Sequence, residues 1–158
     1  MNSLLQTLTQ LVNNDLELYH QLSDELEQHH PFILSTMMGY TLDFNIETAN
    51  DLMILHLLIW SHFRDNPEST KKQITQVIFE KALHRNIALI KYLEGEENDP
   101  ISFSEVVKTD LFKIKSLALM SIIFEAFNQW PNLNQIPPKE KGLLLISIKS
   151  LIESLEGN

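Results

Sequence analysis

The sequence predicts an all-α protein, a single-domain helical bundle of five long helices and one short helix. Hydrophobic residues make up 44% of the 158 residues, which is enough to fill the core of one domain of ordinary size. Glycine occurs only 4 times, and the frequent Leu, Glu, Gln and Lys favour helices over strands. Apolar residues recur at helical spacings of three, four and seven. We expect one domain over residues 1–158, with the 94–100 loop as the place for any subdivision.

The first helix is expected from about Ser3 to Gln28, because a stripe of apolar residues follows the helical period. Its main members are Leu4, Leu8, Leu11, Leu18, Leu22 and Leu26. Asn13-Asn14-Asp15 interrupts the helix-favouring sequence, since these side chains compete for backbone hydrogen bonds, so a bend or a division is expected there. His29-His30-Pro31 ends the helix, because the residue before a proline is disfavoured in helical geometry. A short helix over Phe32–Tyr40 follows.

The segment Leu52–Phe63, LMILHLLIWSHF, is predicted to be the central helix. It is apolar on nearly every side, and a helix of that kind is buried. Asn45 is a suitable N-cap, and the helix should end near Arg64. The apolar run is shorter than the roughly 20 residues that a membrane span needs, so no membrane association is expected.

Two helices are expected in the next part of the chain. Asn66 and Pro67 form a helix start, and the helix should continue to about Leu93. Because the connection to the central helix is short, we expect the two helices to pack antiparallel as a helical hairpin. After the 94–100 loop, Ser102–Glu105 matches a capping box that begins a helix to Asn128.

The second half of that helix, Leu117–Phe127, is almost entirely apolar and is the expected partner of the central helix. A connector with three prolines, Trp130–Pro138, leads to the last helix, which is expected over about Lys139–Leu155. Gly157 is placed to close it, because glycine is favoured just after a helix end.

Charge is distributed very unevenly along the chain. The formal net charge is −9. Residues 1–63 contain eight acidic residues and no Lys or Arg, whereas all 12 basic residues lie from Arg64 onward. An anionic surface repels nucleic acid and attracts basic protein surfaces. The sequence therefore predicts a basic protein partner and no nucleic acid, with contacts made by Asp15, Glu17, Asp24, Glu25 and Glu27.

No motif commits the chain to catalysis or to a metal. Cysteine is absent, which excludes disulfides and thiolate chemistry, and no phosphate-binding loop or nucleophile elbow is present. Glu17–His20 and Glu27–His30 fit the Glu-x-x-His spacing of ferritin-like diiron bundles. Both copies, however, lie on or just after the same helix, and the second runs into Pro31. We therefore expect neither a metal nor a cofactor.

Two polar residues occur inside apolar segments and are candidates for buried groups. His56 lies in the central helix, and the favoured interpretation is a neutral ring bonded to a carbonyl or hydroxyl group. Glu125 is either buried against a cation or exposed at a helix edge. A pair between His56 and Glu125 would be the best catalytic candidate, although nothing in the sequence brings them together.

The function predicted from these features is a non-enzymatic protein-binding module, of the kind represented by acidic helical inhibitors, immunity proteins and adaptors. The N-terminal residues lack the basic start and continuous apolar run of an export signal, so the cytoplasm is the expected location. Two alternatives remain open. One is a metal- or cofactor-binding bundle, and the other is a homo-oligomer, such as a homodimer, formed through apolar surface that a single chain leaves uncovered.

Overall fold

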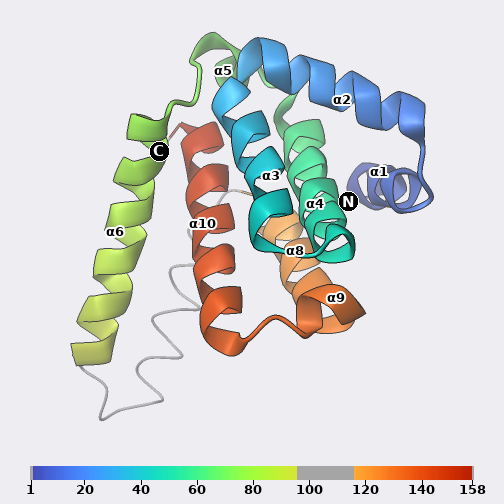
Figure 1. Ribbon diagram of the computed structural model, residues 1–158. Coiled ribbons are helices and arrows are strands. Elements are labelled where there is room, and N and C mark those ends of the chain that lie inside the picture. Colours follow the sequence, from blue (N-terminus) through green and yellow to red (C-terminus); the bar gives the residue numbers. More distant parts are fainter. Residues whose placement is uncertain (1, 96–115, 158) are drawn as a thin grey trace.

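The computed structural model describes residues 2–95 and 116–157, and this part of the chain is built of nine helices with no strand (Figure 1). The helices are α1 (Asn2–Val12), α2 (Leu16–His29), α3 (Pro31–Asp43), α4 (Ile46–Phe63), α5 (Pro67–Lys71), α6 (Gln76–Gly95), α8 (Leu117–Gln129), α9 (Pro131–Asn134) and α10 (Pro138–Glu156). The predicted all-α, single-domain fold is confirmed. The count of five long helices and one short helix was only approximate, because the described residues contain additional short helices and a divided first helix.

The first predicted helix is divided into α1 and α2 at the expected asparagines. Asn14 has a φ of 61°, in the left-handed region that asparagine tolerates better than most residues. The side chain of Asp15 then accepts a hydrogen bond from the Leu18 backbone N–H at 3.1 Å and caps α2. The chain thereby turns between the two helices, which Figure 1 shows meeting at a corner.

The α3 helix is longer than predicted, since it begins at Pro31 and ends at Asp43. Gly39 lies inside the helix, because glycine weakens a helix without breaking it. The start of α4 agrees with the prediction: the Asn45 side chain accepts a hydrogen bond from the Thr48 N–H at 2.9 Å.

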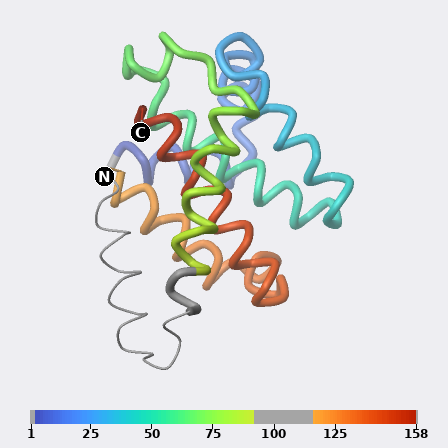
Figure 2. Tube along the Cα trace, turned by 90° about the vertical axis from the view of Figure 1, so that its left-hand side faces the viewer, coloured from blue at the N-terminus to red at the C-terminus, as the bar shows by residue number. Residues whose placement is uncertain are grey.

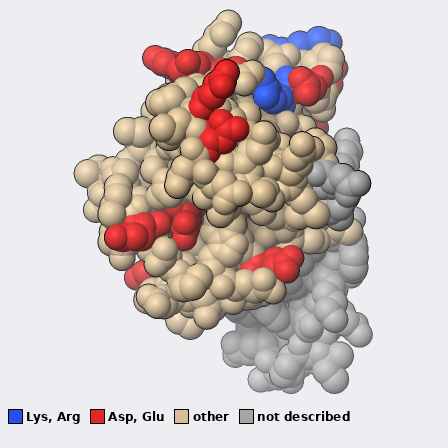
Figure 3. All heavy atoms as spheres, turned by 90° about the vertical axis from the view of Figure 1, so that its right-hand side faces the viewer, with Lys and Arg blue, Asp and Glu red and all other residues tan. Residues whose placement is uncertain are grey.

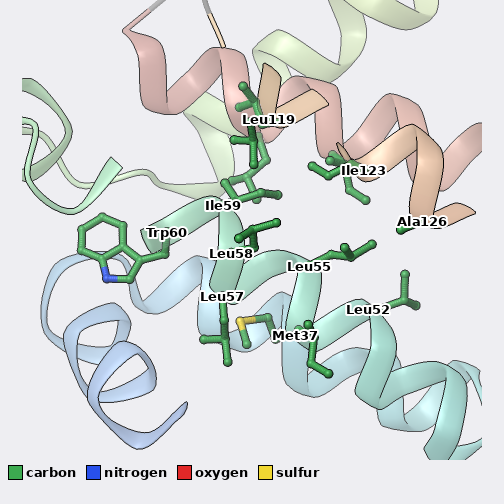
Figure 4. Packing of buried hydrophobic residues seen from close by; sticks show 14 of the residues in the cluster. Met37, Leu52, Leu55, Leu57, Leu58, Ile59, Trp60, Leu119, Ile123 and Ala126 are labelled. Carbon is green, nitrogen blue, oxygen red and sulfur yellow. The ribbon is translucent and has the colours of Figure 1, made fainter. Parts of the chain in front are cut away.

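The α4 helix occupies the centre of the core, as predicted. Leu52, Leu55 and Leu58 are completely buried, and α1, α2, α3, α8 and α9 all pack around the helix. Figure 4 shows Leu119, Ile123 and Ala126 of α8 facing the α4 residues Leu52, Leu55 and Ile59. Burial of each such leucine or isoleucine stabilises the fold by roughly 1.5–3 kcal/mol. The expected pairing of the two most apolar segments is thus confirmed.

The prediction for the helix after Asn66 was wrong in two respects. The chain leaves helical geometry at Lys72, so α5 and α6 are separate helices. In addition, α6 packs against α10 and does not form a hairpin with α4, and Figure 2 shows α6 lying over α10. The physical reason is that other helices already surround α4, whereas α10 offers polar partners for Asn86 of α6.

The end of the chain follows the prediction. Gly157 has a φ of 87° and closes α10 in left-handed geometry. The capping box at Ser102–Glu105 and residues 96–100 of the predicted loop lie outside the described residues. None of the helices in the described ranges is both long and apolar enough to cross a membrane.

Candidate functional site

Three of the five predicted partner-binding residues lie together on the outer face of α2. Glu17, Asp24 and Glu27 are exposed, and their spacings of seven and three place them on one side of the helix. No ion-pair partner for any of them is found among residues 2–95 and 116–157. Their carboxylates are therefore available to a partner.

The other two predicted residues have roles within the chain. Asp15 caps α2, as described above. The half-buried Glu25 carboxylate accepts a hydrogen bond from the Trp60 indole N–H at 3.1 Å and forms an ion pair with Arg64. Glu25 thus joins α2 to the end of α4, and the first basic residue of the chain offsets its charge. The sequence did not distinguish Glu25 from Glu27, although within the described ranges Glu25 has an ion-pair partner and Glu27 has none.

A second acidic area lies where α3 meets α4, and it includes solvent-exposed apolar side chains. Leu42 is 88% exposed, Ile46 is 66% exposed and Met38 is 58% exposed. Asp43 and Glu47 are exposed beside them. Sequence reasoning missed this area, although α3 carries a signal: it is apolar on both faces, and only one face can enter the core.

The same area continues across a hollow to the start of α10. The hollow has a volume of about 350 Å³ and lies between the end of α3 and the first turns of α10. Its lining includes Tyr40, Asp43, Phe44, Glu140 and Leu143, the last of which is 51% exposed. We refer to Met38, Leu42, Asp43, Ile46, Glu47, Glu140 and Leu143 as the acidic corner.

The charge pattern is visible on the face of the molecule shown in Figure 3. Carboxylates are spread across this face, and Lys and Arg side chains appear only at its upper edge. Clusters of one sign raise the local concentration of oppositely charged partners. This arrangement suits attraction of a cationic surface.

His56 is buried beneath the acidic corner, with only 2% of the residue exposed. Its Nδ1–H donates to the Leu52 carbonyl at 2.8 Å, and its Nε2 accepts from the Tyr40 hydroxyl at 3.1 Å. Burial lowers the pKa of His56 to about 4, so the ring is neutral at pH 7. Burial also raises the pKa of Tyr40. Both ring nitrogens are therefore occupied, and Tyr40 connects the hollow to the core.

Glu125 does not join His56. It is exposed on α8, whereas both of its neighbours on the buried side, Ile123 and Ala126, face α4. Of the two alternatives for Glu125, the exposed position is therefore the one found, and no pair with His56 forms because the helix phase directs Glu125 outward.

The residues with Glu-x-x-His spacing are not arranged for metal binding. His30 is fully buried: its Nε2–H donates to the Ser69 carbonyl at 2.7 Å, and its Nδ1 accepts from the Ile74 N–H at 3.0 Å. His20 is exposed on α2. In the ranges that the structure describes, no group of three His, Asp or Glu side chains is placed to hold a metal ion.

Comparison with known proteins gave no relative from which a function could be inferred. No protein family model matches the sequence, and neither a curated protein nor a solved structure shows significant similarity to the chain.

Proposed function

We propose that this protein is a non-enzymatic binding module that engages a basic protein partner through its N-terminal acidic region, with the acidic corner at the centre of the contact. The observation that carries this proposal is the 88% exposure of Leu42 directly beside Asp43. Apolar side chains clustered at a surface with a polar rim are typical of protein interaction sites.

The position of Asp43 supports the same function. It is the last residue of α3, where the helix dipole disfavours a negative charge. An acidic residue at this position weakens the end of α3 slightly. Glu47, in contrast, lies in the first turn of α4, where negative charge is favoured. Together they place two carboxylates around the exposed Leu42 and Ile46.

The partner that fits this surface is an amphipathic basic segment. Its apolar side chains would cover Leu42 and Ile46 and enter the 350 Å³ hollow beside Leu143. Its Lys and Arg side chains would face Asp43, Glu47 and Glu140. Helices that place an apolar face in a groove are a common mode of recognition.

The acidic face of α2 has a different role in this proposal. Glu17, Asp24 and Glu27 line neither the 350 Å³ hollow nor the rest of the acidic corner, so in this proposal they attract the partner from a distance and do not anchor it. Charges at the rim of an interface chiefly change the association rate, whereas buried apolar anchors govern dissociation.

The experiment measures binding of a synthetic helical peptide with leucines on one face and lysines on the other. A peptide with glutamates in place of the lysines is the charge control. Leu42→Ser should weaken binding of the lysine peptide at least about tenfold through faster dissociation. Val77→Ser is the matched control, because Val77 is 75% exposed on α6, away from the acidic corner.

Equal losses in the two variants, or equal binding of the glutamate peptide, would contradict the proposal. A second pair of variants distinguishes an effect on the association rate from an effect on the dissociation rate. The two variants are comparable because each removes three negative charges. The triple variant of Glu17, Asp24 and Glu27 to their amides should slow association and leave dissociation unchanged. The amide variant of Asp43, Glu47 and Glu140 should also accelerate dissociation. If the affinity for the lysine peptide stays constant between about 50 and 300 mM salt, charge attraction does not contribute to binding.

A further inference from the structure

A second hollow, with the opposite charge, lies between α5, α6 and the last turn of α10. Its volume is about 520 Å³, and its lining includes the four cations Lys71, Lys72, Lys81 and Arg85. These are four of only 12 basic residues in a chain of net charge −9. Glu68 and Glu156 are the acids of the lining, so the hollow is locally positive.

Two of the four cations are uncommitted. Arg85 pairs with Glu153 at 3.0 Å, and Lys71 lies 3.4 Å from the exposed Glu68 carboxylate. Neither Lys72 nor Lys81 forms an ion pair or a side-chain hydrogen bond with any residue in the described ranges. Two ammonium groups are therefore available to a ligand.

Buried contacts hold the segment that carries Lys71 and Lys72. His30 bonds to Ser69 before the two lysines and to Ile74 after them. The Ser69 hydroxyl also donates to the Phe63 carbonyl. Because both ends of this short segment are attached to the core, the rim of the hollow is largely pre-formed, which lowers the entropic cost of binding.

The opposite wall is also held in place. The Lys149 ammonium donates to Asn86 Oδ1 at 2.7 Å and to Glu153 Oε1 at 2.7 Å, which fixes α6 against α10. The floor is apolar, with Ile74, Ala82 and Leu155 all buried. The hollow thus combines cations at the rim with an apolar base.

We propose that this hollow binds a small organic oxyanion of at least two negative charges, such as a phosphate ester, that also carries an apolar or aromatic portion. Lysines commonly bind phosphate oxygens as point charges. The volume lies within the roughly 300–1,000 Å³ of small-molecule sites. The carbonyl end of α10 disfavours an anion, so the phosphate lies beside Lys72 and Lys81 and the apolar portion lies toward Leu155.

The test is a titration of the ¹⁵N-labelled full chain with phenyl phosphate, followed through backbone amide shifts, with phenol as the uncharged control. Phenyl phosphate should shift the amides of residues 68–82 and 154–157 in a saturable manner, with a Kd below about 1 mM. The double variant Lys72→Gln with Lys81→Gln should bind at least about tenfold more weakly. Lys91→Gln with Lys139→Gln removes the same charge from outside the hollow and should change the affinity less than about twofold.

Absence of shifts in the hollow at about 10 mM phenyl phosphate would overturn the proposal. Equal weakening by the two double variants would also overturn it, because the effect would then reflect net charge alone. Equal binding of phenol would remove the role of the oxyanion. Leu42→Ser should leave this titration unchanged, so the outcome is independent of the acidic corner.

Discussion

Replacing His30 with alanine is expected to cause the largest loss of stability among the histidines. His30 is completely buried at the junction of α2 and α3. Its neutral ring donates to the Ser69 carbonyl and accepts from the Ile74 N–H, so one side chain attaches the segment between α4 and α6 to the core. The ring also packs against Trp60, with the two centroids 5.2 Å apart.

The magnitude follows from what His30→Ala leaves behind. The Ser69 carbonyl and the Ile74 N–H would lose their partner, at a cost of about 1–3 kcal/mol for each buried group. The space beside Trp60 would add a cavity term, as in other large-to-small substitutions. We expect the free energy of unfolding to fall by roughly 4 kcal/mol, a large part of the typical 5–15 kcal/mol for a domain.

Urea unfolding monitored by far-UV circular dichroism would measure this change. His30→Asn keeps an acceptor near the position of Nδ1, and His30→Gln keeps a donor near Nε2, so both should lie between the wild type and His30→Ala. His20→Ala, at an exposed position of α2, is the control and should cost less than about 0.5 kcal/mol. A loss for His30→Ala of less than about 1 kcal/mol would refute the reasoning.

Three further predictions concern the interior and the helices. Burial lowers the pKa of His30 and that of His56, the latter to about 4. The unfolded chain therefore takes up protons first as the pH falls below about 6.5, so the urea midpoint should decrease from pH 7 toward pH 4 and not stay level. Tyr40→Phe removes the donor to His56 and should cost about 1–2 kcal/mol in urea unfolding, whereas no change would contradict that bond. A Cβ added at Gly39 or Gly142 meets nothing within 4 Å, so alanine at either position should stabilise by about 0.5–1 kcal/mol, and a lower Tm would contradict this.

Local signals were enough to predict the central helix and its start. Asn45 offered a cap, and the run Leu52–Phe63 was apolar on all sides, so its burial did not depend on knowing its neighbours. The division at Asn14 was likewise a local matter, because the asparagine side chain and its tolerance of left-handed geometry act within a few residues.

The partner of α6 could not be predicted in this way. A helical period identifies which face is buried but not which helix covers it. The contact with α10 relies on Asn86, Lys149 and Glu153, residues that in the sequence look like an ordinary solvated surface. Only the fold brings these side chains together, across more than sixty residues of chain.

The candidate site was predictable as a charge but not as a surface. The absence of Lys and Arg before Arg64 was evident from the sequence. Glu25 and Glu27, however, differ only in their position around the helix, and only the structure shows that Glu25 accepts a hydrogen bond from the Trp60 indole. Leu42 is one of many leucines in the sequence, and only the structure shows that Ile33, Met37 and Tyr40 fill the inward face of α3 and leave Leu42 in water. Neighbouring apolar side chains compete for limited space in the core. A list of apolar residues therefore does not show which of them remain exposed to solvent.

The two hollows lie at opposite ends of α10, and their linings differ in charge. Glu140 and Leu143 belong to the acidic corner, whereas Leu155 and Gly157 line the cationic hollow, roughly 20 Å away along the helix. This separation exceeds the screening length of about 8 Å at physiological salt, so the two sites should bind independently there. At about 10 mM salt the screening length approaches 30 Å, and an oxyanion in the hollow should strengthen binding of a basic peptide at the corner. Coupling that persisted at physiological salt would instead require a change in the packing of α10 itself.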